Sequence, residues 1–208
     1  MKNKGILVVV SGFAGAGKGT VMRKLLENYD TYSLSVSATS RKPRPGEEEG
    51  KSYFFRTRDE FEKMIEAGEL LEYAEYVGNY YGTPRAFVEE KLEAGRDVLL
   101  EIEVQGAMQV KKLFPDAFLV FIVPPSAEEL KRRLKKRGTE TDEVIAERMR
   151  RAVEESKDIE AYDYILICDT ADRAAVQLNG MIQAERLRPK RQADFIEEFR
   201  QDLIRENS

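Results

Sequence analysis

A glycine-rich segment near the N-terminus constrains the fold more than any other part of this sequence. Residues 11–20 read SGFAGAGKGT and follow an apolar, β-branched run at residues 6–10, ILVVV. Residues 21–26 then place apolar side chains at helical spacing. The glycines therefore lie between a buried strand and a helix, which is the sequence context of a phosphate-binding loop.

The residue types in this loop suit a phosphate. Glycines let successive backbone N–H groups converge on one point, and the following helix directs its positive end there. Gly12, Gly17 and Lys18 fit the P-loop pattern G-x-x-x-x-G-K, although Gly19 occupies the last position, where serine or threonine is usual. An ordinary glycine-rich turn is the alternative, which the strand, the helix and the lysine together disfavour. We expect a nucleoside triphosphate to bind Gly12, Phe13, Ala14, Gly15, Ala16, Gly17, Lys18, Gly19 and Thr20.

Composition excludes several classes of protein. The chain of 208 residues suffices for one domain with an insertion, and its net charge of −4 argues against nucleic acid as a partner. No apolar run is long enough to cross a membrane, and we expect no signal peptide because the first residues lead directly into a strand. The absence of histidine excludes a Ser-His-Asp triad and a His-ligated metal. The single Cys168 agrees with a reducing cytoplasm, the expected location.

The rest of the chain alternates apolar runs with helical patterns. Runs at residues 97–102, 117–123 and 164–167 predict three more buried parallel strands. This alternation predicts an α/β fold in which helices cover both faces of a parallel sheet. The helix after the run at 117–123 is expected to begin at Ser126, with a capping box to Glu129.

An insertion interrupts this alternation. Runs at residues 53–55 and 70–77 predict strands, with a helix at 59–67 between them. Gly78 and Asn79 then predict a hairpin. These elements predict a small α+β unit inserted into the parallel sheet.

Two later segments also differ from the core pattern. Residues 138–158 combine Gly138 with an acidic, arginine-rich helix that has few apolar groups, as is typical of a lid. The tail from Pro189 predicts one more amphipathic helix. That helix either packs on the core, which is the simpler interpretation, or contacts another subunit, which would make the protein a homo-oligomer. Its apolar side chains are Phe195, Ile196, Phe199, Leu203 and Ile204.

Arginines and hydroxyl groups gather in residues 35–47, SVSATSRKPRPGE. Arg41 and Arg44 on this proline-stiffened loop suit a second anion because guanidinium binds phosphate oxygens bidentately; a solvated basic loop is the equal alternative. Glu72 lies in a predicted strand, where a solvent-facing position is the alternative to a functional one. Its carboxylate can accept from two adjacent donors, which guanine presents at N1 and N2, whereas adenine presents an acceptor at N1.

Four longer segments of the chain resemble the guanylate kinase family: SATSRKPRPGE, EYVGNYYGTP, EIEVQGA and VPPSAEELKRRLKKRGTET. The resemblance extends over residues 5–186 and implies transfer of the γ-phosphoryl group of ATP to GMP, with Mg²⁺ as cofactor. It implies three units: a P-loop core at 1–36, 96–137 and 159–208, a GMP-binding insertion at 37–95 and a lid at 138–158. It also implies a GMP site formed by Ser37, Arg41, Arg44, Tyr53, Glu72, Tyr81, Thr83 and Glu101.

The resemblance also implies how the reaction is catalysed. Two anions must meet in line, so the protein contributes positioning and electrostatic stabilisation. Within the basic cluster 131–137, which is otherwise expected to be a solvated helix face, Arg137 resembles a lid arginine. Thr20, Glu101 and Glu103 are candidates to hold Mg²⁺ through water. The expected catalytic residues are Lys18, Arg41, Arg137 and Arg148.

The chain departs from the family pattern in its phosphate loop and near the expected adenine position. Phe13 and Ala14 stand where the family usually has Pro-Ser, Gly19 lacks a hydroxyl group, and Cys168 replaces a common asparagine. Two other functions compete with the kinase. A guanylate kinase-like binding module would typically lose the loop lysine and the guanine-reading residues, which are present here. A kinase for another phosphorylated acceptor is disfavoured by Glu72.

Overall fold

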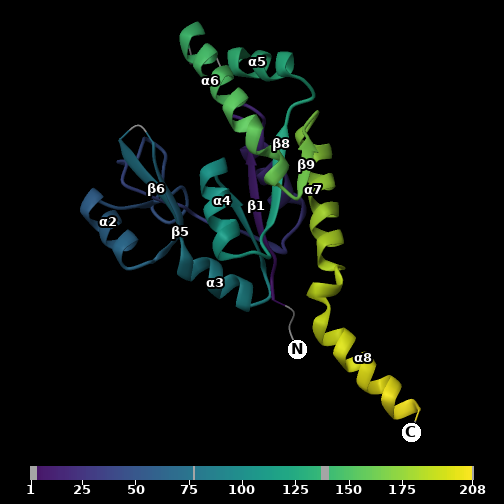
Figure 1. Cartoon of the computed structure of the whole chain (residues 1–208). Coiled ribbons are helices and arrows are strands. Elements are labelled where there is room, and N and C mark those ends of the chain that lie inside the picture. Colours follow the sequence, from purple (N-terminus) through teal and green to yellow (C-terminus); the bar gives the residue numbers. More distant parts are fainter. Residues whose placement is uncertain (1–3, 77, 137–140, 208) are drawn as a thin grey trace.

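The computed structural model describes residues 4–76, 78–136 and 141–207 (Figure 1). Its larger sheet is parallel and has the strand order β2-β7-β1-β8-β9. The predicted α/β fold is confirmed, because helices cover both faces of this sheet. The strands are β1 (Leu7–Gly12), β2 (Tyr32–Leu34), β7 (Asp97–Glu101), β8 (Phe118–Val123) and β9 (Tyr164–Ile167).

Alternate residues of the central strands pack under different helices, because successive side chains of a strand point to opposite faces. Val8 and Val10 face helices α1 (Lys18–Asn28) and α7 (Ala171–Arg186). Leu7 and Val9 belong to a second core with α3 (Arg85–Glu93) and α4 (Val104–Leu113). Burial on both faces explains why these strands read as continuous apolar runs.

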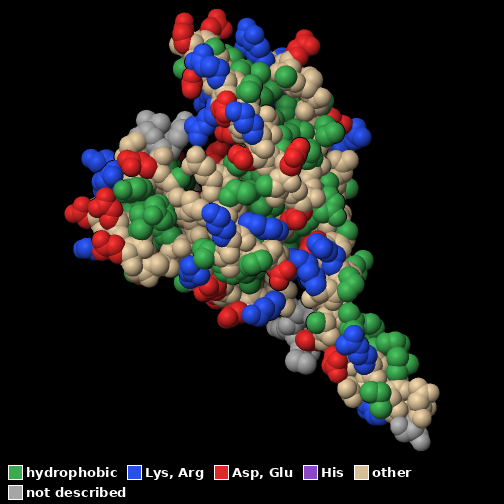
Figure 2. Space-filling model, in the orientation of Figure 1, with side chains coloured by type: hydrophobic (Ala, Val, Ile, Leu, Met, Phe, Trp, Pro, Cys, Tyr) green, Lys and Arg blue, Asp and Glu red, His purple; other side chains and the backbone are tan. Residues whose placement is uncertain are grey.

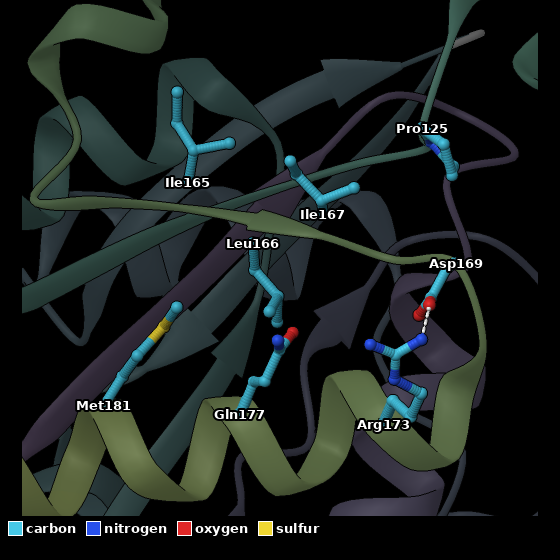
Figure 3. A pocket seen from close by; sticks show the side chains of 8 residues that line it. All are labelled: Pro125, Ile165, Leu166, Ile167, Asp169, Arg173, Gln177 and Met181. Atoms are coloured by element: carbon cyan, nitrogen blue, oxygen red, sulfur yellow. Dashed lines mark hydrogen bonds and ion pairs between the residues drawn. The ribbon is translucent and has the colours of Figure 1, made fainter.

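The sheet differs from the sequence prediction at its two edges. β2 was not predicted, because a three-residue strand with a central serine carries little periodic signal. β9 was predicted to be buried, and this is wrong: Ile165 and Ile167 are 51% and 56% exposed. β9 is an edge strand, and Leu166 is buried beneath α7 while Ile165 and Ile167 point away from that helix (Figure 3). A surface pocket runs along this edge.

The predicted insertion forms the smaller sheet, with the strand order β4-β3-β6-β5. β5 (Leu70–Tyr76) and β6 (Asn79–Pro84) pair antiparallel, as the hairpin prediction required. Helix α2 (Arg58–Glu66) starts with a capping box at Thr57 and buries Phe61 against this sheet. The remaining strands are β3 (Ala38–Thr39) and β4 (Phe54–Phe55).

The helices α5 (Ala127–Lys136) and α6 (Asp142–Glu155) lie together at one end of the molecule (Figure 1). Leu130 and Leu134 of α5 pack against Ile145 of α6. The predicted capping box of α5 is half formed: Ser126 Oγ accepts from the Glu129 backbone at 3.1 Å. The Glu129 carboxylate binds arginines of the same helix instead of returning to Ser126. A short 3-10 helix, η1 (Ser156–Ala161), follows α6.

The C-terminal segment consists of a 3-10 helix, η2 (Pro189–Arg191), and helix α8 (Ala193–Glu206). Figure 1 shows α8 pointing away from the rest of the molecule. None of its described residues is buried, so the interpretation that this helix packs on the core is wrong. Among the described residues, no helix has both the length and the apolar character that a membrane span requires.

Candidate active site

The phosphate loop connects the end of β1 to the start of α1. Gly15 and Gly17 have φ angles of 89° and 106°, which L-residues with a side chain rarely adopt. Ala16 is completely buried, and its backbone N–H donates to the Phe13 carbonyl at 2.9 Å. α1 begins at Lys18, so the free N–H groups of its first turn face the loop. These glycines therefore have the conformational role that the sequence predicts.

The side chain of Lys18 binds the backbone of its own loop. Its Nζ donates to the carbonyl of Gly12 at 2.5 Å and lies 3.5 Å from the carbonyl of Phe13. The ammonium group therefore lies against the carbonyl oxygens at the start of its own loop. Its positive charge also acts on the carboxylate of Glu101, at the end of β7.

Arg133 of α5 supports the phosphate loop, so the expectation that it lies on a solvated helix face is wrong. Its guanidinium donates to the carbonyls of Ala16 at 2.9 Å and Cys168 at 2.8 Å, and its Nε donates to Glu129 at 2.7 Å. A signal was present in the sequence, because Arg133 follows Leu130 by three positions and lies beside the apolar stripe of α5. Arg133 thus connects α5 to both the phosphate loop and the segment after β9.

A second group of predicted residues meets on the insertion. The Arg41 guanidinium forms a bidentate ion pair with Glu47, with N–O distances of 2.8 and 3.0 Å. Arg41 Cζ lies 5.4 Å from the centre of the Tyr53 ring, and the rings of Tyr53 and Tyr81 are 6.0 Å apart. Glu47 also accepts from the Arg44 backbone N–H at 2.7 Å, which orders the loop. The structure therefore brings together a cation and two phenol rings from residues far apart in sequence.

Electrostatics reinforce this cluster. The hydrogen bonds that Arg41 donates to Glu47 raise the pKa of Arg41, and Tyr81 adds to that rise. In return, Arg41 and then the Arg44 N–H lower the pKa of Glu47. Desolvation raises the pKa of Tyr53, so its hydroxyl keeps its proton near neutral pH. The cluster therefore combines a guanidinium that is paired with Glu47 and the neutral hydroxyl of Tyr53, and both can donate to an anion.

Glu72 occupies a buried position on β5. Thr83 Oγ1 of β6 donates to Glu72 Oε1 at 2.6 Å, and both side chains are buried. Burial raises the pKa of Glu72, and the hydrogen bond from Thr83 opposes that rise. The alternative of a solvent-facing strand residue is therefore wrong. A buried carboxylate with one paired oxygen has capacity for a further donor.

Gly106 of α4 makes room for this carboxylate. A methyl group on Gly106 would lie 2.6 Å from Glu72 Oε2, closer than side-chain carbons approach other atoms. Gln109, one turn further along α4, exchanges two hydrogen bonds of 3.2 Å with the backbone of Tyr73 on β5. α4 belongs to the core, so these contacts fix Glu72 relative to the parallel sheet. Gly106 lies in the segment EIEVQGA, but no pattern in the sequence predicted a role for this glycine.

Glu101 lies between the two groups of residues. Desolvation raises the pKa of Glu101, although solvent reaches the residue. The charge of Lys18 lowers this pKa, and the charge of Glu103 raises it. The charge of Glu101 in turn raises the pKa of Tyr53. The same carboxylate therefore interacts with the phosphate loop and with the Arg41 cluster, so both face a common region. Desolvation also raises the pKa of Glu155, at the end of α6. Glu103 adds to this rise and Lys18 opposes it.

The remaining predicted site residues are placed as follows. Arg148 is a half-buried residue of α6, and Arg137 lies outside the described residues. Ser37 precedes β3, and its carbonyl accepts from the Phe54 N–H at 2.9 Å. Thr20 is an exposed residue in the first turn of α1. Within the described residues, no group of three acidic or cysteine side chains forms a metal-binding cluster.

A phosphate loop at the carboxyl end of a parallel sheet, facing a second cationic cluster on an insertion, defines a P-loop phosphotransferase. The family model for guanylate kinase matches residues 4–185. The guanylate kinase of Lactococcus lactis is 53% identical over 191 residues, which cover 92% of this chain and 93% of the relative. That of Bacillus subtilis is 50% identical over 194 residues, covering 93% and 95%.

A solved structure shows the same similarity. The crystal structure of guanylate kinase from Anaplasma phagocytophilum has 35% identity and a TM-score of 0.75, covering 92% of this chain and 91% of that chain. The chain belongs to the guanylate kinase family. It is therefore an enzyme, and its reaction is the phosphorylation of GMP by ATP.

Proposed function

We propose that the phosphate loop holds ATP, that the cluster on the insertion holds GMP, and that the γ-phosphoryl group is transferred between them. The observation that carries this assignment is the buried Glu72 carboxylate, bonded on one side by Thr83 and close to Gly106 on the other. Glu72 lies on the same small sheet as Tyr81, and Tyr81 interacts with Arg41. One unit thus offers a base reader and a phosphate site.

Phosphate binding requires positive charge at both substrates. Lys18 and the loop amides neutralise the donor phosphates, while Arg41, Arg44, Tyr53 and Tyr81 bind the phosphate of GMP. A GMP phosphate oxygen is itself the nucleophile, so the protein contributes alignment and charge stabilisation rather than a general base. The bidentate pair with Glu47 holds the Arg41 guanidinium in place before GMP arrives, and the phosphate would bind the N–H groups that Glu47 does not use.

Guanine recognition rests on hydrogen-bond complementarity. The carboxylate of Glu72 accepts from N1–H and N2–H₂ of guanine, and Ser37, Thr83 and Glu101 complete the contacts to the base. Adenine would direct its N1 lone pair at this buried carboxylate and offer it no donor, so that Thr83 would remain the partner of Oε1 and Oε2 would stay unpaired. Leaving buried polar groups unpaired discriminates by roughly 10⁴-fold where a site is built on such bonds.

A divalent metal accompanies ATP in this reaction, and we infer that it is Mg²⁺. The oxygen donors near the loop fit this ion: Mg²⁺ keeps several waters and uses one or two carboxylates with substrate phosphates, not a complete protein cage. Glu101 faces the phosphate loop, since a methyl group on Gly19 would lie 3.6 Å from its Oε1. Thr20, Glu101 and Glu103 would hold the ion through water, and the ion would neutralise charge on the transferred phosphoryl group.

We infer the same three units that the sequence predicts. Residues 37–95 bind GMP, residues 138–158 close over ATP, and the remainder is the P-loop core. Arg148 supports the lid assignment because it lies on α6. The last residue of this helix is Glu155, whose pKa is lowered by the charge of Lys18 in the phosphate loop. Arg137 precedes the lid and is proposed as the second lid arginine.

A coupled ADP-release assay with Mg-ATP tests the proposal. Each of GMP, AMP, CMP and UMP is offered as acceptor at equal concentration. Turnover with GMP alone, or a preference for GMP of roughly 10³-fold or more, is the expected result. Comparable turnover with another acceptor would contradict the role of Glu72, and no turnover with any acceptor would favour a binding module.

A further inference from the structure

Phe13 of the phosphate loop lies where three hydrophobic cores of the molecule meet. Among the apolar residues of the described chain, Phe13 alone packs against three cores. Two of them cover the opposite faces of the parallel sheet, and the third is the small core between α5 and α6. The Phe13 ring also meets that of Phe121 on β8 edge to face, with centres 5.1 Å apart. The side chain therefore belongs to the framework of the sheet and touches the helix pair as well.

The small core of the helix pair lies against the phosphate loop. Its four buried side chains are Leu130, Leu134, Ile145 and Ala152. A methyl group on Gly15 would lie 2.9 Å from Leu134 Cδ2 and 3.6 Å from Leu130 Cδ1, so this glycine of the loop is in direct contact with α5. Figure 2 shows charged side chains of both signs on the outer surface at the end of the molecule where these helices lie. The apolar contacts of the pair are therefore directed inward, to Phe13 and Gly15.

We propose that Phe13 is a positioning residue that holds α6 at a fixed distance from the phosphate loop. This inference rests on the proposed role of Arg148 as a lid arginine. Arg148 follows Ile145 by three positions in α6, so the two side chains are neighbours on the helix surface. The Phe13 ring packs against the core to which Ile145 belongs, while the Phe13 carbonyl accepts from the Ala16 N–H at 2.9 Å within the loop. One residue thus connects the backbone proposed to bind ATP with the helix that carries Arg148.

The contact affects turnover because the charge of an arginine must be aligned with the transferred phosphoryl group. Without the Phe13 ring, the helix pair keeps its own core but loses a side chain that it shares with the sheet. The helix α6 should then sample a wider range of positions relative to the loop, and only a fraction of molecules would hold Arg148 in the productive one. Turnover falls by that fraction, and a misplacement of about 1 Å costs on the order of 10²-fold. We therefore expect Phe13→Ala to lower kcat by about 10- to 100-fold.

The loss should be confined to the side of the site that the helix pair covers. The proposed GMP site lies on the insertion, which packs around Phe61 in a core of its own. The dissociation constant of GMP should therefore stay within about twofold of the parent value in Phe13→Ala. The conservative variant Phe13→Leu keeps an apolar side chain between the three cores, and it should restore kcat to within about threefold of the parent.

Phe114→Ala is the matched control. Phe114 follows α4 and, like Phe13, is a half-buried residue whose carbonyl accepts from the N–H three positions later, that of Ala117 at 2.8 Å. It packs against the core of the α3 and α4 face. Both alanine variants should lower the melting temperature because each removes a half-buried ring. Only Phe13→Ala should lower kcat.

A distance measurement tests the position of α6 without relying on turnover. The double variant Val153→Cys/Val176→Cys carries one spin label on α6 and one on α7, at positions that are exposed, while the native Cys168 is buried. Pulsed electron paramagnetic resonance on the full chain without nucleotide gives the distribution of distances between the labels. Adding Phe13→Ala should broaden this distribution, whereas adding Phe114→Ala should leave it unchanged.

Arg148→Met separates this inference from the function on which it rests. It leaves the contacts of Phe13 in place, so it should lower kcat by roughly 100-fold with an unchanged distance distribution. A normal kcat in Arg148→Met would refute the proposed lid arginine. An unchanged distance distribution or a normal kcat in Phe13→Ala, or an equal loss of kcat in Phe114→Ala, would overturn the positioning role of Phe13.

Discussion

Replacing Gly106 by alanine tests how the core positions Glu72, the residue proposed to recognise guanine. In an ordinary helix interior this change stabilises a protein by about 0.5–1 kcal/mol, because alanine loses less backbone entropy than glycine. At Gly106, however, the added methyl group would lie 2.6 Å from Glu72 Oε2, and ordinary contact begins at 3.4 Å. The carboxylate or the helix must therefore move by about 0.8 Å.

The magnitude follows from what holds the carboxylate. Thr83 donates to Glu72 at 2.6 Å, so a shift of this size weakens that bond and misaligns both acceptors with the base. A misplacement of about 1 Å costs on the order of 10²-fold in a positioned site. We expect kcat/KM for GMP to fall by about 10- to 100-fold, or about 1.4 to 2.7 kcal/mol. The dissociation constant of ATP should stay unchanged.

The assay compares two alanine variants. Gly180 lies in α7, and a methyl group there would meet no atom within 4 Å. Gly180→Ala should therefore raise the melting temperature by about 1–4 °C and leave GMP kinetics unchanged. Gly106→Ala should have a lower kcat/KM for GMP than the parent, and its melting temperature should rise little or not at all. Steady-state kinetics, differential scanning calorimetry and isothermal titration with ATP give the three quantities.

One result would refute this reasoning. If Gly106→Ala kept kcat/KM for GMP within about twofold of the parent and gained as much stability as Gly180→Ala, the close approach of α4 to Glu72 would have no functional consequence. Recovery of activity in Gly106→Ala with the shorter acid of Glu72→Asp would, in contrast, support displacement of the carboxylate.

Variants at three residues test the two proposed substrate sites and the buried acid. Lys18→Ala should lower kcat by about 10³-fold or more, and a folded variant with near-normal kcat would disprove its role at the phosphates. Arg41→Met should weaken GMP binding in calorimetry and spare ATP; equal losses would mean that the loop is misassigned. Glu72→Gln should lower the ratio of kcat/KM for GMP to kcat/KM for AMP, because an amide can donate to adenine N1. Because burial raises the pKa of Glu72 above 4.5, its ionisation costs stability as pH rises through the raised pKa. Glu72→Gln should therefore unfold at higher denaturant concentration than the parent at pH 8, with a difference that shrinks toward pH 4.

The phosphate loop could be predicted from sequence because its information is local. Strand, glycines, lysine and helix follow one another within residues 6–26, and each acts through its neighbours in the chain. The positive φ angles of Gly15 and Gly17 and the start of α1 at Lys18 agree with that prediction. The central strands were predictable for a similar reason, since burial on both faces selects continuous apolar runs.

Predictions failed where an element's environment depended on distant parts of the chain. β9 has the same apolar character as β8, but it lies at the edge of the sheet. The amphipathic pattern of α8 correctly predicts a helix, yet a periodic pattern does not specify which surface covers it. Arg133 was counted with its solvated neighbours, although it binds a loop more than a hundred residues away.

The sequence by itself thus determined the α/β class and the phosphate loop and suggested the residue types of the proposed acceptor site, because these depend on short-range periodicity and on the chemistry of single side chains. Only the tertiary structure decided that Glu72 is buried, bonded to Thr83 and approached by Gly106. The physical reason is that burial and hydrogen-bond partners are properties of elements packed together. A strand residue with the same neighbours in sequence can face water or the core, and the packing of α4 against β5 made that choice.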